Sequence, residues 1–500
     1  MSGPGSYFAV QAVDDQTGRG VPLVELRTPS NVCYYTDSAG FAAIDDPNYM
    51  GRTIYFKVSS HGYADVVDGY GFHGVSMDVS PGGSVQLRIH RLNIAERLYR
   101  ITGEGIYRDS VMLGRPVPIE QPLLNAQVVG QDSAQPVVYH GKIHWFWGDT
   151  CRLGAPLGHF GTAGAVSDLP GHGGLDPSVG INLHYFVDAG GFSRPMVPVP
   201  NNCFRWVDAV TTVKDDDGND RLVARVLLLK NGKDVDARQL LMYDDATDTL
   251  KPIADIPPNA LLEPLNFAVT GEPGRRDYAY FARAFPNVRV RADLRSFEDL
   301  SSYEAFTCLA PGTRYDKDKS ILDRDPTGKL VWAWKKQTDP LDRDEMAAML
   351  KSGRIRPDEV WFAPRDVETK KLISIYTSSV SYNEFRRKWI MIGGELDGST
   401  SMVGEIWYSE ADQPEGPWVW ARKIVTHDRH SFYNPVHDAF FDQAGGRLIY
   451  FEGTYDSSPY AAAESRPDSD ATPRYDYNQI MYRLDLSDPR LALPAVSGKS

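Results

Sequence analysis

The feature that most constrains the fold of this chain is a repeat of strand pairs between residues 120 and 490. Four segments share one pattern: a basic turn, then alternating aromatic and aliphatic residues, then a polar or charged end. They are GKIHWFWGDT (141–150), RDYAYFARAF (276–285), RKWIMIGGEL (387–396) and GRLIYFEGTY (446–455). Because another strand-like run precedes each segment, the pattern predicts four antiparallel hairpins.

A fifth hairpin is predicted at RWVDAVTTVKDDDGNDRLVARVLLLK, residues 205–230. Outer strands follow most pairs, in ARQLLMYDDATDTL, GEIWYSEADQPEGPWVWARKI and NQIMYRLDLSD. Five units of three or four strands within about 370 residues match the blades of a five-bladed β-propeller. A large jelly roll is the alternative all-β fold, but it supplies no reason for a fivefold recurrence.

Residues 1–93 have a different pattern, in which short alternating strands are separated by glycine-containing turns. Seven or so short strands in about ninety residues indicate a β-sandwich. The motifs D-x-x-T-G-x-G-V-P and T-D-S-x-G-F within this segment resemble the carboxypeptidase-regulatory or transthyretin-like sandwiches. We therefore expect an all-β chain of a sandwich (1–93), a connector (94–119), a propeller (120–490) and a C-terminal tail (491–500).

Bulk composition excludes several classes of function. The net charge of −13 argues against a nucleic-acid partner, since phosphate binding requires clustered Lys and Arg. No run of about 18 apolar residues predicts a membrane span, and the opening MSGPGS has neither the basic nor the apolar region of a signal peptide. The 4 cysteines, in a chain of 500 residues, predict neither a disulfide framework nor a zinc site.

When the repeat is arranged as the blades of a propeller, polar and aromatic residues are expected to gather at one end of the central channel, which we call the mouth. Inner-strand starts and second-strand ends meet there, because the two strands of each pair are antiparallel. The residues expected at this mouth are Asp132, Asp149, Trp206, Asp208, Asn266, Arg283, Glu395, Tyr433, Asn434, His437 and Glu452.

Carboxylates in this set suit the cleavage of a glycosidic bond. That reaction requires one protonated carboxylic acid and one ionised carboxylate. Asp132 and Asp149 are expected to lie closest together, because neighbouring strands of the first unit carry them, and Glu452 is the third catalytic candidate. The remaining mouth residues are expected to bind substrate. A carboxylate at a strand end also commonly caps a turn or pairs with an arginine, and this structural role is the alternative for each.

A further series of motifs resembles a known enzyme family. The series is G-x-D-S, F-W-G-D-T, Y-N-x5-W-I-M-I, A-D-x-P-x-G-P-W, Y-N-P and Y-F-E-G. It resembles the five-bladed propeller domain that includes the endo-D-arabinanases of glycoside hydrolase family 183, and more distantly the family 43 enzymes. The resemblance implies that Asp132 and Asp149 are the acid/base or nucleophile pair, that no cofactor is required, and that the protein is secreted or periplasmic.

The sequence thus predicts a glycoside hydrolase. Its expected partner is a glycan substrate, either a polysaccharide or an oligosaccharide, and furanosidic chains are among the candidates. One alternative is a polysaccharide lyase, with Tyr433 or His437 as base and Arg283 neutralising a uronate. Another is a non-catalytic glycan-binding protein. A structural calcium ion in the propeller channel, the oligomeric state, and retention or inversion at the anomeric carbon stay open.

Overall fold

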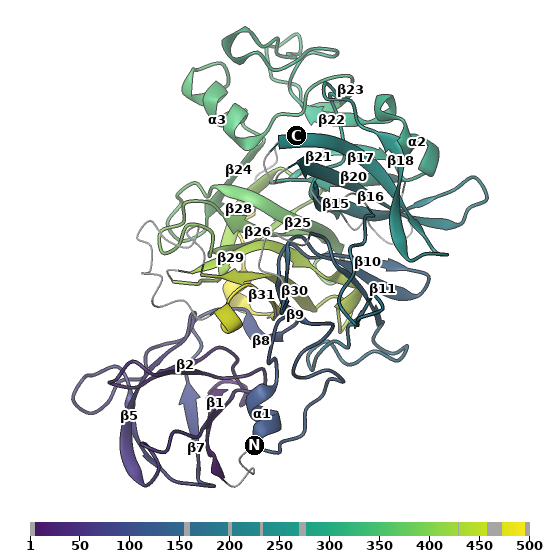
Figure 1. Cartoon of the computed structure of the whole chain (residues 1–500). Helices are drawn as coiled ribbons and strands as arrows, with labels where there is room; N and C mark the ends of the chain where they lie inside the picture. Colours follow the sequence, from purple (N-terminus) through teal and green to yellow (C-terminus); the bar gives the residue numbers. More distant parts are fainter. Residues whose placement is uncertain are drawn as a thin grey trace.

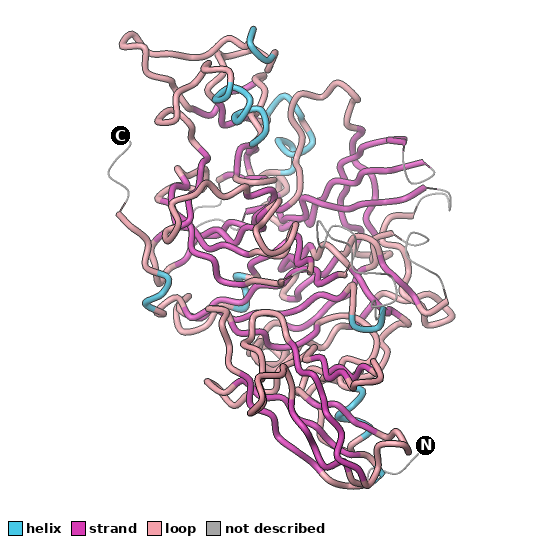
Figure 2. The backbone as a smooth tube through the Cα atoms, turned by 90° about the vertical axis from the view of Figure 1, so that its left-hand side faces the viewer, coloured by secondary structure: helices cyan, strands magenta, loops and turns pink. Residues whose placement is uncertain are grey.

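The structure is a computed structural model that describes residues 6–154, 161–198, 203–230, 234–269, 277–428, 430–457 and 473–495. The predicted all-β class is confirmed, because strands dominate both views of the backbone (Figures 1 and 2). The α-helices of the described residues are short: α1 (Arg108–Met112), α2 (Leu294–Glu298) and α3 (Arg343–Lys351). Among the described residues, no helix is long and apolar enough to cross a membrane.

Two sheets built from the first ninety residues occupy one end of the molecule, at the bottom of Figure 1. One has the strand order β4-β1-β7, and the other has the order β3-β2-β5-β6. Their bounds are β1 (Phe8–Asp14), β2 (Glu25–Arg27), β3 (Cys33–Tyr35), β4 (Phe41–Ile44), β5 (Arg52–Ser59), β6 (Val75–Val79) and β7 (Ser84–Ile89). A single hydrophobic cluster joins both sheets, with Val10, Leu26 and Phe56 at its centre.

Besides a two-stranded sheet of β9 (Val128–Gln131) and β12 (Thr150–Arg152), five larger sheets follow one another along the described part of the chain. The first three are β10-β11-β13-β14, β15-β16-β17-β18 and β19-β20-β21-β22-β23. Their strands are β10 (Gln135–Tyr139), β11 (Lys142–Phe146), β13 (Gly164–Asp168), β14 (His184–Tyr185), β15 (Cys203–Lys214), β16 (Asp220–Lys230), β17 (Asp234–Asp244), β18 (Thr249–Asp255), β19 (Phe267–Val269), β20 (Tyr278–Ala282), β21 (Pro286–Arg291), β22 (Glu304–Thr307) and β23 (Ala333–Lys336).

The last two sheets have the orders β24-β28-β27-β26-β25 and β29-β30-β31-β8. Their strands are β8 (Glu96–Arg100), β24 (Phe362–Asp366), β25 (Ile375–Asn383), β26 (Lys388–Glu395), β27 (Ile406–Ala411), β28 (Trp418–Val425), β29 (Ser431–His437), β30 (Leu448–Asp456) and β31 (Asn478–Asp485). The strand β8 comes from the segment expected as a connector. It pairs with β31 and so completes the last sheet with a strand from before the first.

All five predicted hairpins are present as antiparallel pairs: β10–β11, β15–β16, β19–β20, β25–β26 and β29–β30. Their registers place the start of each first strand opposite the end of the second, as in Gln135 opposite Phe146 and Ser431 opposite Asp456. The starts of first strands and the ends of second strands therefore lie at the same end of each sheet. We call this end of the five sheets the mouth.

Hydrophobic clusters hold the five sheets together in sequence. Each cluster draws side chains from two consecutive sheets, such as Phe146 and Val226 from the first and second, or Phe285 and Met391 from the third and fourth. One cluster joins the last sheet back to the first and contains Trp145 and Tyr450. Apolar side chains on both faces of strands such as β26 and β30 explain this arrangement, because every sheet has a neighbour on either side.

Candidate active site

Asp132 and Asp149 face each other across a short strand pair at the mouth. Asp132 follows β9 (Val128–Gln131), Asp149 precedes β12 (Thr150–Arg152), and Gln131 is opposite Thr150 in this antiparallel pair. The backbone N–H of Asp132 donates to the carbonyl of Asp149 at 3.3 Å, and that of Gly148 donates to the carbonyl of Asp132 at 2.8 Å. The two carboxyl side chains therefore start from opposed positions on one strand pair, which places them close together.

Two tyrosines from the last sheet surround this pair. The Tyr433 hydroxyl donates to Oδ2 of Asp132 at 3.1 Å. The Tyr477 hydroxyl donates to the carbonyl of Asp149 at 3.3 Å. Oδ1 of Asp132 is buried and has no hydrogen-bond partner among the described residues. It lies so near Gly148 that a Cβ added there would be 2.2 Å from it.

Burial raises the pKa of both carboxyl groups of the pair. Burial, reinforced by the charge of Asp149, raises the pKa of Asp132 to about 7, although Tyr477 and Tyr433 lower it. Burial also raises the pKa of Asp149, against the hydrogen bond from Trp206. Near neutral pH, Asp132 therefore holds a proton readily. A carboxylic acid that keeps its proton near neutral pH beside a second carboxyl group is an arrangement that general acid–base chemistry can use.

Trp206, on β15, presents an aromatic face next to the pair. Its indole Nε1 donates to Oδ1 of Asp149 at 3.2 Å, while 42% of the residue is exposed. The bond fixes the ring beside the carboxylate and leaves much of its face in solvent. Such a ring can stack on an apolar face of a ligand, because a large aromatic surface is favourable to cover.

A pocket of about 350 Å³ adjoins the pair. Asn266, Arg283, Tyr376 and Asn434 are among its lining residues. The Asn434 side chain donates to Oγ of Ser133 at 2.7 Å, so this pocket begins one residue from Asp132. Arg283 is exposed, and its guanidinium makes no hydrogen bond or ion pair within the described ranges. The pocket thus offers amide, hydroxyl and guanidinium groups to a polar ligand.

Asp208, which is also on β15, is paired with Arg225 and with the backbone of Asn266. It accepts two hydrogen bonds from Arg225, at 3.0 and 3.1 Å, and one from the backbone N–H of Asn266 at 3.2 Å. Burial raises the pKa of Asp208, against the opposing effect of Arg225. Its role in the structure is to position Asn266, which has a left-handed backbone (φ 59°) that asparagine tolerates better than most residues.

The structure places Glu452 below the mouth, inside the protein. It is fully buried on β30, two residues from Thr454, whose hydroxyl accepts from the backbone N–H of Ser133 at 3.0 Å. Glu452 and the equally buried Asp438 have carboxylate oxygens without partners among the described residues. Burial raises the pKa of both. A fully buried side chain cannot contact a substrate at the mouth. The structure therefore gives no support to the prediction that Glu452 is catalytic.

His437 and Glu395 also lie outside the Asp132–Asp149 pair. Nδ1 of His437 is 2.5 Å from Oγ of Ser381, and its Nε2 is 2.8 Å from Oδ1 of Asp442. His437 and Asp442 line a separate pocket of about 430 Å³, which residues from all five first strands surround. Glu395 is half-buried and accepts from Nε1 of Trp407 at 2.8 Å. Both residues therefore have structural partners of their own.

Three residues of the site were missing from the sequence prediction: Tyr477, Tyr376 and Gly148. Gly148 lies in a repeat segment and Tyr376 in the strand-like run before another, where small and aromatic residues carry no signal of a site. Tyr477 precedes β31, a position that the repeat assigns to an outer strand. It reaches Asp149 because the last sheet packs against the first, and this contact has no counterpart in local sequence.

No metal centre is apparent in the part of the chain that the structure describes. No group of three or more His, Cys, Asp and Glu side chains there is arranged to hold an ion. All four cysteines lie within the described residues, and no disulfide joins any two of them. A calcium ion in the channel therefore stays a prediction.

Comparisons with known proteins give distant structural likenesses only. The sequence matches no protein-family profile and no curated protein. The structure is similar to a thermostable family 43 glycoside hydrolase (10% identity, 74% of this chain and 97% of that chain, TM-score 0.31). It is also similar to a β-xylosidase (12%, 73% and 95%, TM-score 0.34) and to an arabinanase from Bacillus subtilis (8%, 71% and 93%, TM-score 0.32). TM-scores this low carry no argument about this chain.

Proposed function

We propose that this protein is a glycoside hydrolase whose five consecutive sheets are the blades of a five-bladed β-propeller. The cyclic series of clusters supports the propeller, as does the pocket that all five first strands line. The two N-terminal sheets form its accessory sandwich. The observation that carries the function is the pair Asp132 and Asp149 at the mouth. A secreted or periplasmic location belongs to the same proposal.

In the proposed reaction, Asp132 is the proton donor. Its pKa, raised to about 7 chiefly by burial, keeps it protonated near neutral pH, so it can protonate the departing glycosidic oxygen. Asp149 is the ionised partner, whose charge stabilises positive charge that develops on the sugar ring or activates the attacking group. Trp206 holds Asp149 through its indole N–H.

The groups around the pair suit the recognition of a sugar. Trp206 supplies a stacking face, and Asn266, Arg283, Tyr376 and Asn434 supply hydrogen-bonding groups in the adjoining pocket. A pocket of about 350 Å³ is within the range of about 300–1,000 Å³ typical of small-molecule sites. Furanosidic chains remain the substrate expected from the sequence resemblance.

The lyase alternative has less support from the geometry. It needs a base near the mouth, but His437 lies in the separate pocket, where Ser381 and Asp442 engage both ring nitrogens. Burial and the charge of Asp132 raise the pKa of Tyr433 well above its usual value, which makes it a poor base near neutral pH. Arg283 is the one lyase candidate that faces the pocket beside the pair.

The test is a panel of polysaccharides assayed for new reducing ends, containing arabinans, arabinoxylan and β-1,3-galactan. We expect at least one glycan to be cleaved by the wild type, and Asp132→Asn and Asp149→Asn each to lose at least about 100-fold in kcat/KM. Asp216→Asn, at an exposed residue paired with Arg295, is the matched control. Full activity in both site variants would overturn the assignment. Products that absorb in the near ultraviolet would indicate a lyase.

A further inference from the structure

Two side chains of the last sheet hold the backbone on either side of Asp132. The amide Nε2 of Gln479, on β31, donates to the carbonyl of Gln131 at 3.2 Å. The hydroxyl of Thr454, on β30, accepts from the backbone N–H of Ser133 at 3.0 Å. The same Nε2 of Gln479 donates to that hydroxyl at 2.7 Å, so the two side chains form one unit. Because Gln131 and Ser133 are the chain neighbours of Asp132, the position of Asp132 depends on this unit.

Ser133 has a backbone conformation that is costly for serine. Its φ is 52°, in the left-handed region that residues with a Cβ rarely adopt. Such a conformation persists only where the surrounding structure enforces it. Two hydrogen bonds supply this restraint: the N–H of Ser133 donates to Thr454, and the side chain of Asn434 donates to Oγ of Ser133 at 2.7 Å. Without them, the turn that carries Asp132 would be free to relax.

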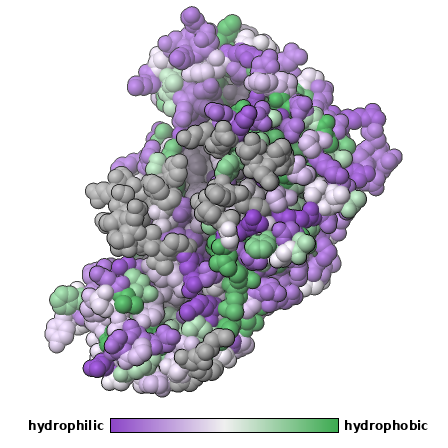
Figure 3. Space-filling model, viewed as in Figure 1, coloured by the Kyte–Doolittle hydropathy of each residue, from purple (hydrophilic) through white to green (hydrophobic). Residues whose placement is uncertain are grey.

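The two holding side chains lie inside the protein. Hydrophilic (purple) residues predominate on the face shown in Figure 3, as is usual for a protein surface. Gln479 and Thr454, in contrast, are fully buried, as are Gln131 and Thr150. Nε2 of Gln131 donates to the hydroxyl of Thr150 at 3.2 Å. Four linked and buried polar side chains therefore adjoin the candidate active site from within.

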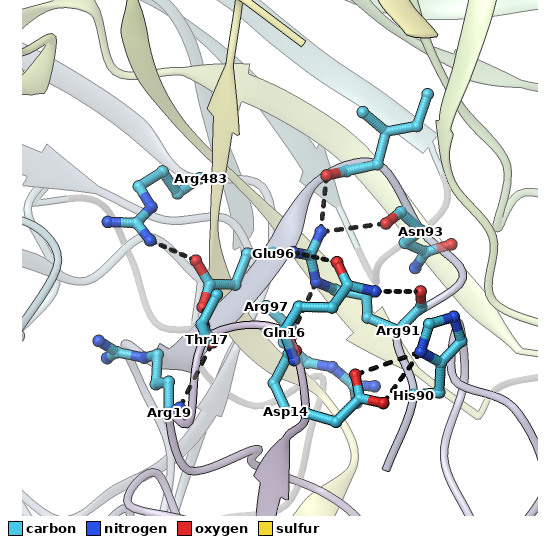
Figure 4. Close-up of polar contacts among 12 residues, drawn as sticks. Asp14, Gln16, Thr17, Arg19, His90, Arg91, Asn93, Glu96, Arg97 and Arg483 are labelled. Carbon is cyan, nitrogen blue, oxygen red and sulfur yellow. Dashed lines mark hydrogen bonds and ion pairs between the residues drawn. The ribbon is translucent and has the colours of Figure 1, made fainter.

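The backbone of Gln479 is itself fixed on both sides. β31 is a central strand, with β30 on one side and β8 on the other. Next to β8, the N–H of Ile101 donates to the carbonyl of Gln479 at 2.8 Å, and the N–H of Gln479 donates to the hydroxyl of Thr102 at 3.1 Å. β8 is anchored in turn, because Thr17 donates to its Glu96 at 2.9 Å (Figure 4). Gln479 therefore presents its amide from a rigid element.

We infer that Gln479 and Thr454 are positioning residues that hold Asp132 in the place that its reaction requires. This inference rests on the proposed function and goes beyond it, because it assigns a role to two residues outside the site. Neither side chain contacts substrate, since both are fully buried, and both act through the peptide groups beside Asp132. A proton donor must lie within hydrogen-bond reach of the atom that it protonates, so a small displacement lowers the rate.

The test removes each hydrogen-bonding group with little change in the shape of the side chain. We expect Thr454→Val and Gln479→Met each to lose about 10-fold or more in kcat on a cleaved glycan. KM should stay within about twofold of the wild type, because the groups that bind substrate are unchanged. Thr454→Ser keeps the hydroxyl and should recover kcat to within about threefold of the wild type. Gln479→Met tests the inference by itself if Thr454→Val fails to fold.

Thr307→Val is the matched control. Thr307, on the outer strand β22, is as fully buried as Thr454, and its hydroxyl accepts from the backbone N–H of Leu309 at 3.2 Å. The variant removes the same kind of bond at a distance from the site. Its kcat should therefore equal that of the wild type, whatever its melting temperature.

A double-mutant cycle with Asp132→Asn separates positioning from general damage. If Thr454 acts through Asp132, Thr454→Val should lower the residual rate of Asp132→Asn by less than about twofold. Losses that multiply in the double variant, wild-type kcat in Thr454→Val or Gln479→Met, or no recovery in Thr454→Ser would overturn the inference and leave the proposed function standing. If Asp132→Asn keeps full activity, or no glycan is cleaved, the proposed function fails and the inference fails with it.

Discussion

Trp206 donates its indole N–H to Oδ1 of Asp149 at 3.2 Å, and this bond joins the second sheet to the Asp132–Asp149 pair. The bond lowers the pKa of Asp149 against the effect of burial. Trp206→Phe keeps an aromatic ring and removes the donor. We expect a loss of about 10-fold or more in kcat/KM, since hydrogen bonds to charged groups contribute about 1.5–3 kcal/mol.

The measurement for Trp206→Phe is kcat/KM against pH on a cleaved glycan. The lower limb of the profile should shift to higher pH, because Asp149 loses a group that favours its ionised form. Trp420→Phe is the matched control, since Trp420 lies on β28 beneath Lys370. A variant with wild-type kinetics would show that the bond does not matter for catalysis.

The protonation of Asp132 predicts how activity depends on pH. Burial and the charge of Asp149 raise the pKa of Asp132 to about 7. As a proton donor it is active below that pKa, so kcat/KM should fall as pH rises through about 7. Rates measured from pH 5 to 9 test this, and a profile that is flat from pH 6 to 8 would exclude Asp132 as the acid.

The position of Gly148 predicts a substitution that lowers activity without lowering the stability of the fold. A Cβ at residue 148 would lie 2.2 Å from Oδ1 of Asp132, so Gly148→Ala must displace this carboxyl group. Because a side-chain end can move, we expect a large loss of activity, about 10-fold or more, with little change in melting temperature. Gly154→Ala is the control, since its Cβ would meet only Phe192 at 3.8 Å. Unchanged activity in Gly148→Ala would contradict the role of Asp132.

The buried acid Glu452 predicts a dependence of stability on pH. Burial raises its pKa, so the folded protein keeps a proton that the unfolded chain releases near pH 4.3. Its contribution to stability is therefore present below about pH 4.3 and is lost as pH rises toward the folded pKa. In Glu452→Gln, the fall in melting temperature between pH 5 and pH 8 should be smaller by about 2 °C or more. Parallel curves for both proteins would show that Glu452 does not titrate in this range.

The buried ion pair of Arg91 and Asp14 predicts a large contribution to the stability of the N-terminal sheets. Both side chains are almost fully buried, and Nε of Arg91 lies 2.7 Å from Oδ2 of Asp14. Arg91→Met leaves Asp14 as an unpaired buried charge, which costs about 3–5 kcal/mol in similar cases. Denaturant unfolding measures this loss. Arg291→Met breaks an exposed pair with Asp293 and should cost about 1 kcal/mol or less. Equal costs would mean that the buried pair contributes no more to stability than an exposed one.

Local periodicity was enough to predict the strands and their pairing. The hairpin β15–β16 and the strand β31 were predicted from alternating apolar residues and turn signals alone. This works because a strand pair joined by a short turn is determined by contacts between near neighbours in the chain. The neighbouring positions of Asp132 and Asp149 follow from the same local pairing.

Contacts between segments that are far apart in the chain could not be predicted from the sequence. Nothing in residues 94–119 indicates that β8 completes the last sheet, and nothing near Tyr477 indicates that it reaches Asp149. The repeat likewise placed Glu452, His437 and Asp132 at one mouth. The structure separates them, because the depth of a residue along its strand and the sheet face it occupies depend on bulges and on packing between sheets.

The sequence by itself determined the all-β class, the five hairpins and the first candidate carboxylate pair, since strand periodicity and turns act over short distances. Only the tertiary structure decided which carboxylates are buried and unpaired, which tyrosines contact the Asp132–Asp149 pair, and that β8 completes the last sheet. Those relationships depend on how whole sheets pack, and packing joins residues that are hundreds of positions apart.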